Sequence, residues 1–260
     1  TMILGQPIRV TRTGQDSYRV TEIGEDGSEG RELPVQTRFT CIFTTLGEPT
    51  RPLPEITEFD ESDRIVVGCG NVGVNTSPYR LVENFLDMAH FSFIHVDTLG
   101  ATDKTEVLAY RTEHRKDVDE IWAVDCIFIQ PAASKAVKGG QMTRYLYRVM
   151  SPFSVMLYKN ISEDSDRNDA ICVFIQPLTE TRCLAYMPMA IVDNENTAAD
   201  IADFQQSIFL QDRVILENQR PALLPLDPTY ELPTRADASS IAFRRWLKAM
   251  DISFGIHEKQ

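Results

Sequence analysis

Two of the four histidines in this chain lie within residues 83–95, which read Glu-Asn-Phe-Leu-Asp-Met-Ala-His-Phe-Ser-Phe-Ile-His. On a helix, the spacing of three residues places Asn84, Asp87 and His90 on one face. The remaining positions are mostly apolar, which predicts a helix that is buried nearly all round. Imidazoles in such a place need partners, because an unpaired buried polar group costs about 1–3 kcal/mol. One metal ion bound by His90 and His95, with Asp87 behind the ligands, would meet this need.

The five-residue separation of the two histidines limits how they could share an ion. On an ideal helix it turns His95 about 140° away from His90, so both reach one ion only if the helix has a π-bulge or ends near His95. The alternative is a pair of core histidines hydrogen-bonded to backbone carbonyls. With one carboxylate from elsewhere, the pair would form the two-histidine, one-carboxylate triad that is typical of non-haem iron(II) sites.

Candidate carboxylates lie on a second predicted helix. Asp212 precedes an apolar stretch of that helix, and Asp203 and Glu217 are rivals on the same segment. Spacing alone does not choose among the three, because a solvated carboxylate that pairs with Arg213 would produce the same pattern.

The composition excludes several classes of partner. The chain has 260 residues, 43% hydrophobic and 25% charged, which is typical of a globular protein with one large domain or two small ones. A net charge of −12 without a basic cluster disfavours nucleic acid and anionic membranes. No apolar run approaches the about 20 residues of a membrane span, and no signal-peptide pattern is visible. The five widely spaced cysteines are expected to be reduced, and we expect a cytoplasmic protein.

The N-terminal part is predicted to be all β. Strands are expected over residues 6–12, 18–22 and 36–46, with a polar, glycine-rich loop over 23–32. A proline-rich connector over 49–54 suggests a boundary, which divides the chain into residues 1–48 and 49–260.

The larger C-terminal part is predicted to be α+β. A strand over 64–69 precedes the histidine helix, which begins at Ser77 and Pro78, a cap followed by a favoured first-turn residue. Consecutive strands then imply one antiparallel sheet. The six predicted strands cover 105–115, 120–130, 142–150, 154–161, 169–176 and 180–192. A long helix over 197–217, a loop over 221–235 and a helix over 238–250 that carries Trp246 complete the prediction.

The histidine stretch also carries a family resemblance. Asn84-x2-Asp87-x2-His90-x4-His95 resembles the mononuclear iron motif of Rieske non-haem iron oxygenases. The two-residue gap between Asn84 and Asp87 is similar to the vanillate O-demethylase and dicamba monooxygenase branch of that family.

A second block supports the same resemblance. Gln211-Asp212-Arg213-x3-Glu217-x-Gln219 resembles the segment that donates the carboxylate ligand, and the similarity covers most of residues 45–250. It implies a helix-grip (START-like) catalytic domain in which His90, His95 and Asp212 bind Fe(2+). Asn84 would line the site as a polar support, with helix packing as the alternative, and Glu217 and Gln219 would brace the long helix.

The resemblance also identifies what this sequence lacks. These oxygenases normally carry a Rieske [2Fe–2S] domain with Cys-x-His and Cys-x2-His ligand pairs, and this chain has neither pair and no histidine before His90. Residues 3–46 nevertheless resemble the first and last strands of a Rieske domain. We therefore expect a degenerate Rieske-like β subdomain without a [2Fe–2S] cluster. Since both flanks of the cluster-binding middle remain, we interpret its loss as natural rather than as a truncation.

A missing cluster implies imported electrons. In the family, electrons pass from the cluster of one subunit to the iron of its neighbour through an aspartate at the position of Asp87. The resemblance therefore implies a Rieske-bearing homologous subunit, in a mixed trimer or hexamer, that is supplied by an NADH-dependent reductase. Bacterial methylxanthine N-demethylase systems contain a similar cluster-less component.

The implied function is that of an oxygenase subunit for a small aromatic or heteroaromatic substrate and O2. It would hydroxylate an N- or O-methyl group and release formaldehyde, with methylxanthine N-demethylation as the sharpest candidate. One alternative is a non-catalytic structural subunit that partners an active homologue. Another is a metal-free binding protein of the helix-grip type that holds an apolar ligand in its cavity.

Overall fold

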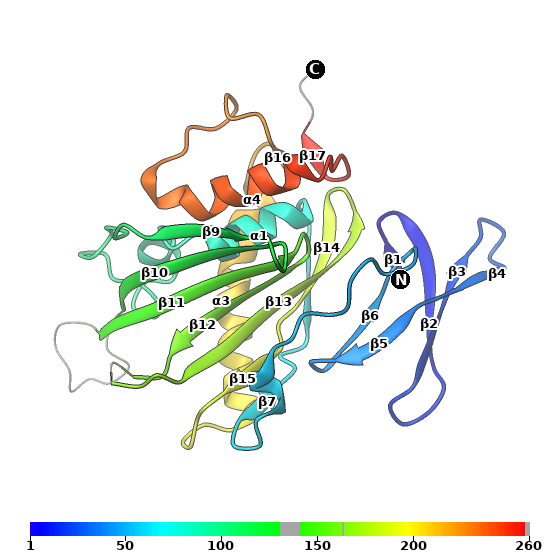
Figure 1. Cartoon of the computed structure of the whole chain (residues 1–260), viewed down its shortest axis with the longest axis horizontal. Coiled ribbons are helices and arrows are strands. Elements are labelled where there is room, and N and C mark those ends of the chain that lie inside the picture. Colours follow the sequence, from blue (N-terminus) through cyan, green and yellow to red (C-terminus); the bar gives the residue numbers. More distant parts are fainter. Residues whose placement is uncertain (131–140, 163, 258–260) are drawn as a thin grey trace.

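A computed structural model describes residues 1–130, 141–162 and 164–257 of the chain. Figure 1 shows a broad antiparallel sheet with one long helix behind it, and a separate group of N-terminal strands to one side. The N-terminal strands are β1 (Met2–Ile3), β2 (Gln6–Arg12), β3 (Tyr18–Ile23), β4 (Glu29–Leu33), β5 (Val35–Arg38) and β6 (Cys41–Thr44). The predicted α+β class with a large antiparallel sheet is confirmed.

The central sheet has the strand order β7-β15-β13-β12-β11-β10-β9, and β14 and β8 extend it beside β13. Its strands are β7 (Ile65–Val67), β8 (Asn71–Val74), β9 (Arg111–Arg115), β10 (Glu120–Gln130), β11 (Gln141–Ser151), β12 (Ser154–Asn160), β13 (Asn168–Thr179), β14 (Arg182–Tyr186) and β15 (Met189–Ile191). Paired residues point to the same face of a sheet, so the register aligns whole rows of side chains. One row is Tyr145, Lys159 and Asp169, and the next is Tyr147, Leu157 and Ile171.

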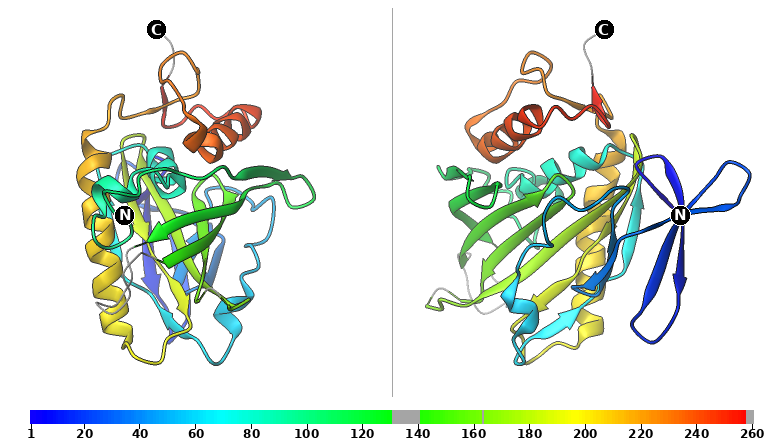
Figure 2. Two further views of the ribbon diagram at one scale, coloured as in Figure 1. Left: turned by 90° about the vertical axis from the view of Figure 1, so that its left-hand side faces the viewer. Right: turned by 45° about the vertical axis from the view of Figure 1, so that its right-hand side comes forward.

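Four α-helices cover this sheet. They are α1 (Pro78–Leu86), α2 (Phe91–Ile94), α3 (Ala198–Asn218) and α4 (Ala238–Ala249), with short 3₁₀ turns at Thr57–Asp60 and Arg235–Asp237. Figure 2 shows α3 running along one face of the sheet, while α4 crosses one end near the two-stranded pair of β16 (Leu224–Pro225) and β17 (Ile256–His257). The apolar core lies between the helices and this face of the sheet.

The opposite face of the sheet is covered by chain from the N-terminal part. Phe39 and Ile56 pack there against Met156, Cys172 and Phe174, which β12 and β13 present on that face. The preceding strands β1–β4 form their own small sheet around a core of Ile8, Val20 and Leu33. That small sheet contacts the main one where the Leu4 amide donates to the Pro177 carbonyl at 2.7 Å. The predicted boundary between residues 48 and 49 stays a prediction.

Several predicted elements differ from the structure, and the strand expected over 36–46 is a hairpin of β5 and β6. The expected loop over 23–32 contains β4, because a turn with Gly27 at φ +80° returns the chain to β3, where Arg19 pairs with Glu29 and Glu32. The expected strand over 180–192 is divided into β14 and β15 near Pro188, which has no amide hydrogen for a sheet. Of the strand expected over 105–115, only Arg111–Arg115 pairs with the sheet.

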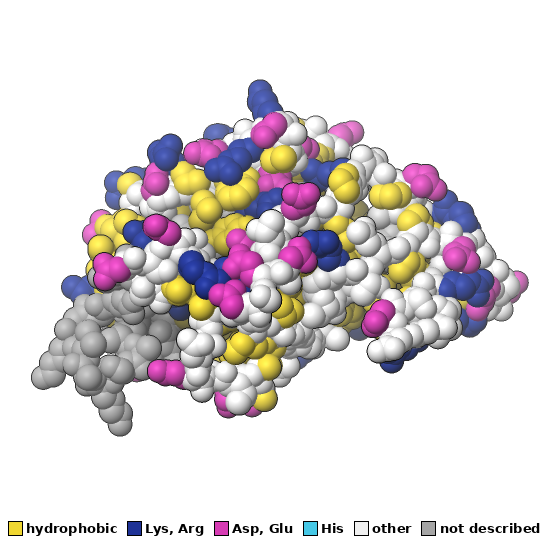
Figure 3. Space-filling view, turned by 60° about the horizontal axis from the view of Figure 1, so that its bottom comes forward, with side chains coloured by type: hydrophobic (Ala, Val, Ile, Leu, Met, Phe, Trp, Pro, Cys, Tyr) yellow, Lys and Arg dark blue, Asp and Glu magenta, His cyan; other side chains and the backbone are white. Residues whose placement is uncertain are grey.

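The surface and the thiols agree with the composition. Figure 3 shows acidic and basic side chains interspersed over the face that it presents. All five cysteines are free thiols, and four of them are buried. In the part of the chain that the structure describes, no helix combines the length and the apolar character that crossing a bilayer requires.

The N-terminus of α3 offers a test of how firmly the long helix is fixed. Thr197 Oγ1 accepts a hydrogen bond from the Asp200 amide at 3.2 Å, and Asp200 Oδ2 accepts one from the Thr197 amide at 2.9 Å. Thr197→Ala removes half of this capping box and is expected to lower the free energy of unfolding by about 1 kcal/mol in urea denaturation. Thr181→Ala, in the exposed turn between β13 and β14, is the control and should be neutral; equal effects would contradict the prediction.

Candidate metal centre

The histidine stretch is not one continuous helix, and the prediction of one is wrong. Helix α1 ends at Leu86, Asp87 is its C-cap with ψ 118°, and the single turn of α2 begins at Phe91. The cause lies in Asp87, whose Oδ1 accepts a hydrogen bond from the Ala89 amide at 2.7 Å. Such a side-chain contact offers the backbone an alternative to the helical bond.

This break solves the problem posed by the five-residue spacing. His90 immediately precedes α2 and His95 is its C-cap, so the short helix α2 meets one of the two conditions named for this spacing, a helix end near His95. The prediction that this helix is buried nearly all round is wrong at Phe93. Its side chain is 66% exposed, because α2 is a single turn near the surface. His95, by contrast, is 1% exposed.

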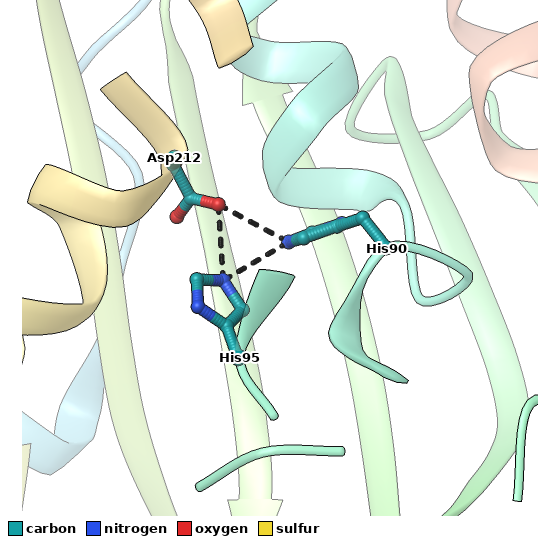
Figure 4. A group of neighbouring side chains, drawn as sticks. All are labelled: His90, His95 and Asp212. Atoms are coloured by element: carbon teal, nitrogen blue, oxygen red, sulfur yellow. Dashed lines mark hydrogen bonds and ion pairs between the residues drawn. The ribbon is translucent and has the colours of Figure 1, made fainter. Parts of the chain in front are cut away.

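Three side chains from two distant segments converge at this point. His90 Nε2 and His95 Nε2 lie 3.2 Å apart, and Asp212 Oδ1 lies 3.2 Å from the first and 3.0 Å from the second. Figure 4 shows the two imidazoles and the carboxylate of α3 directed at one common point. They form the one His/Cys/Asp/Glu group among the described residues whose ligand atoms could hold a metal ion together.

The spacing of these three atoms allows them to bind one metal ion together. Ligands bound at about 2.1 Å lie about 3.0 Å apart when they subtend right angles and about 3.4 Å apart when they are tetrahedral. The observed 3.0–3.2 Å lies within this range. Two histidines and one carboxylate in that arrangement are typical of non-haem iron(II) sites with open positions.

Each imidazole is also held through its other nitrogen. His90 Nδ1 lies 3.3 Å from Asp87 Oδ2, and His95 Nδ1 lies 2.7 Å from Gln211 Oε1. An acceptor at Nδ1 places the ring proton there and leaves the Nε2 lone pair free for a metal. Asp87 was predicted to stand behind the ligands, whereas no such role was predicted for Gln211. Its position next to Asp212 was the available signal.

The structure separates the rival carboxylates. Glu217 Oε1 accepts hydrogen bonds from the Asn75 amide at 3.0 Å and from Arg213 Nε at 3.0 Å, so it ties α3 to another segment. Arg213 thus pairs with Glu217 and not with Asp212, and Asp203 is exposed. Glu217 therefore has the bracing position expected of it.

Asn84, the polar residue predicted to line the site, contacts the triad only at long range. Its Nδ2 lies 3.5 Å from Asp212 Oδ1, and Asn84 belongs to the lining of the adjacent cavity. This position agrees with a polar support beside the carboxylate.

A buried ion-pair network fixes α1, which leads into the histidines. Arg80 is fully buried, and its guanidinium contacts Glu231 Oε1 at 2.6 Å and Glu83 Oε2 at 3.3 Å. Arg244 of α4 donates to the same Glu83 carboxylate at 2.8 Å. Breaking one partner of such a buried network typically costs about 3–5 kcal/mol, so α1 has little freedom to shift.

Charges around the triad favour a protonated imidazole when no metal ion is bound. Burial opposes the charge on His90, but Asp212 and Asp87 outweigh it and raise the pKa of His90 to about 9. Burial likewise opposes the Asp212 carboxylate, and the two imidazoles overcome it and lower the pKa of Asp212. A proton and a metal ion therefore compete for Nε2 of His90.

A cavity of about 990 Å³ opens beside the three side chains. Its walls are largely apolar on the side of α1, α3 and the second row of the sheet, with Leu81, Phe85, Leu157, Ile171 and Phe209 among the lining residues. Polar lining residues on the sheet include Gln130, Thr143, Tyr145, Lys159 and Asp169, and others lie before and in the first turn of α3, namely Asp193, Glu195, Asn196 and Asp200. This volume and mixed lining suit a small, mostly apolar ring with polar edges.

Comparisons with known sequences agree with this site. Residues 74–251 match the family model described as the vanillate O-demethylase oxygenase C-terminal domain. The chain is 44% identical over 224 residues to a probable methylxanthine N7-demethylase, NdmC, of Pseudomonas sp. (strain TJI-51), covering 86% of this chain and 79% of that protein. It is 22% identical over 245 residues to a vanillate O-demethylase oxygenase subunit of Pseudomonas sp. (strain ATCC 19151), covering 85% and 74%.

Solved structures agree in fold. NdmA of Pseudomonas putida CBB5 with caffeine has a TM-score of 0.76 at 16% identity, covering 95% of this chain and 82% of that one. Dicamba monooxygenase bound to dicamba has a TM-score of 0.71 at 15% identity, covering 96% and 91%. With a family model over residues 74–251 and a 44% identical relative, the chain belongs to the vanillate O-demethylase oxygenase family of Rieske-type non-haem iron oxygenases, an enzyme family of oxygenases and demethylases.

Proposed function

We propose that this chain is the iron(II)-binding oxygenase component of an N-demethylase for methylated heteroaromatic compounds, with methylxanthines as the substrate class. The observation that carries the proposal is the triad of His90, His95 and Asp212, with ligand atoms 3.0–3.2 Å apart beside a 990 Å³ cavity. The 44% identity to a probable methylxanthine N7-demethylase supports the substrate class.

The chain's own residues would each have a defined task. His90, His95 and Asp212 would hold the iron, and bound iron(II) would supply the activation of O2 that protein side chains lack. Asp87 and Gln211 would keep the ring protons on Nδ1, away from the metal. The apolar cavity walls would exclude bulk water and hold the methyl group toward the triad.

The reaction requires electrons from outside the chain. Inserting one oxygen atom of O2 into a methyl C–H bond, while the other leaves as water, consumes two electrons and two protons. The resulting N-hydroxymethyl group then breaks down to formaldehyde and the demethylated ring. We propose that a Rieske-bearing homologous subunit, in a mixed trimer or hexamer with an NADH-dependent reductase, supplies the electrons. The position of Asp87 supports a donor on another subunit, since its side chain is 30% exposed to an approaching partner and also contacts His90.

The N-terminal part fits the same proposal. We interpret β1–β4, with their small core of Ile8, Val20 and Leu33, as a Rieske-like remnant without a [2Fe–2S] cluster over residues 1–48. Residues 49–260, with α3 lying across the curved sheet, would be a helix-grip catalytic domain. The second candidate function is a non-catalytic subunit that stabilises an active homologue, which the same missing Cys–His pairs favour.

Iron content and turnover together test the proposal. The full chain, reconstituted anaerobically, is expected to bind about one equivalent of iron(II), and His90→Ala to retain less than about a tenth. The control is His114→Ala, because His114 is exposed and pairs with Asp119, far along the sequence from the triad. When wild type is combined with the partners that co-purify from the native host, it should release formaldehyde from 7-methylxanthine. Wild type that binds no iron would favour the non-catalytic subunit. A complex that binds iron but releases no formaldehyde from methylxanthines would contradict the substrate class.

Proton release gives a second, independent prediction. Because the pKa of His90 is raised to about 9, the imidazole is protonated at pH 7, and metal binding must displace that proton. Binding of iron(II) at pH 7 is expected to release about one proton, falling toward zero above pH of about 10. Anaerobic calorimetry in buffers of different ionisation enthalpy measures this number. Binding at pH 7 without proton release would contradict the ion pairing described for His90.

The role of Gln211 can be tested by paired substitutions. Gln211→Leu removes the acceptor at His95 Nδ1 and is expected to weaken metal affinity about 10- to 100-fold. Gln211→Glu keeps an acceptor oxygen of nearly the same reach and should retain most of the affinity. A competition titration against a chelator compares the variants, and a Leu variant equal to wild type would show that Gln211 does not orient His95.

A further inference from the structure

The sheet wall of the cavity carries Lys159, a lysine without a partner among the described residues. Lys159 of β12 pairs across the sheet with Tyr145 of β11 and Asp169 of β13, so the three side chains lie on the same face. All three line the cavity that His90 also lines. Within the described ranges, the Lys159 ammonium makes no hydrogen bond and no ion pair within 4.0 Å.

Three polar side chains near Lys159 on this wall are hydrogen-bonded to one another. Gln130 donates to the Tyr145 hydroxyl and accepts from Thr143 Oγ1 at 3.2 Å, so this trio leaves little for a ligand. On the opposite face of the same sheet, Arg148 pairs with Glu120 at 2.7 Å. Among the described residues, Lys159 therefore differs from this trio in lacking a partner, a property that it shares with the buried Tyr147 hydroxyl.

Burial makes the unpartnered ammonium costly. Burial lowers the pKa of Lys159. The nearby negative charge of Asp169 opposes this effect, although the two side chains form no direct ion pair. Asp169 Oδ1 accepts a hydrogen bond from the Val192 amide at 2.9 Å, which leaves the other carboxylate oxygen for a further donor. A donor and an acceptor thus stand side by side on adjacent strands and face the cavity.

We infer that Lys159 and Asp169 are substrate-recognition residues that bind a ring carbonyl and the adjacent ring N–H of the heteroaromatic substrate. This inference rests on the proposed function and specifies the part of the substrate that is bound. Lys159 would donate to the carbonyl oxygen, and Asp169 would accept from the N–H. A methyl group on that nitrogen would remove the donor and press against the buried carboxylate, so the pair selects substrates whose far edge is unmethylated.

Binding measurements on the purified full chain separate this inference from the proposed function. Calorimetry with 7-methylxanthine, which keeps its ring N–H groups, and caffeine, which has none, is expected to show preference for the former in wild type. Lys159→Met keeps the apolar stem and is expected to weaken binding of 7-methylxanthine about tenfold or more. Asp169→Asn should reduce the ratio between the affinities for 7-methylxanthine and for caffeine. Lys248→Met, on the exposed side of α4, is the matched control and should bind as wild type does.

Thermal unfolding provides a readout that does not depend on the substrate. Removal of a desolvated, unpaired ammonium is expected to raise the unfolding temperature of Lys159→Met, even as binding weakens. A lowered unfolding temperature, or unchanged affinity for 7-methylxanthine, would overturn the recognition role while leaving the proposed function intact. Wild type that binds no methylxanthine would instead overturn the proposed substrate class, and with it the ligand assigned to this pair.

Discussion

The structure depends on keeping one carboxylate and two imidazoles within 3.0–3.2 Å of each other in a mostly buried place. Such a group is stable only if its charges are compensated, by a shared proton or by a metal ion. Both remaining imidazole nitrogens already have acceptors, on Asp87 and Gln211. The Nε2 atoms and Asp212 Oδ1 are therefore what the site presents to an ion, and the two segments that carry them must be held rigidly.

The contacts that hold α1 in place differ in kind from those that hold α3. On the side of α1 the support is electrostatic: fully buried Arg80 pairs with Glu231 and Glu83, and Glu83 also binds Arg244. On the side of α3, the helix is capped by Thr197 and is joined to the chain before α1 through Glu217. The residues of the ion-pair network lie outside the described lining of the cavity, whereas Asp200 of the α3 cap belongs to that lining.

The triad and the cavity lie together, and one side chain connects the triad to the surface. The Asp87 side chain is 30% exposed, and its carboxylate contacts His90. The N-terminal part packs on the outer face of the sheet and contacts the sheet again where the Leu4 amide donates to the Pro177 carbonyl.

The sequence by itself determined the positions of β10 to β13 and the capped long helix, because periodicity and capping are local properties. Only the tertiary structure decided the break at Asp87, since a side-chain bond to the Ala89 amide competes with helix propagation there. Spacing alone did not separate Asp212 from Glu217; the family resemblance favoured Asp212, and in the structure Glu217 turns to Asn75 and Arg213. Alternation in a strand defines two faces but not which one is inward, so the cavity position of Lys159 came from the sheet register and the helix that covers it.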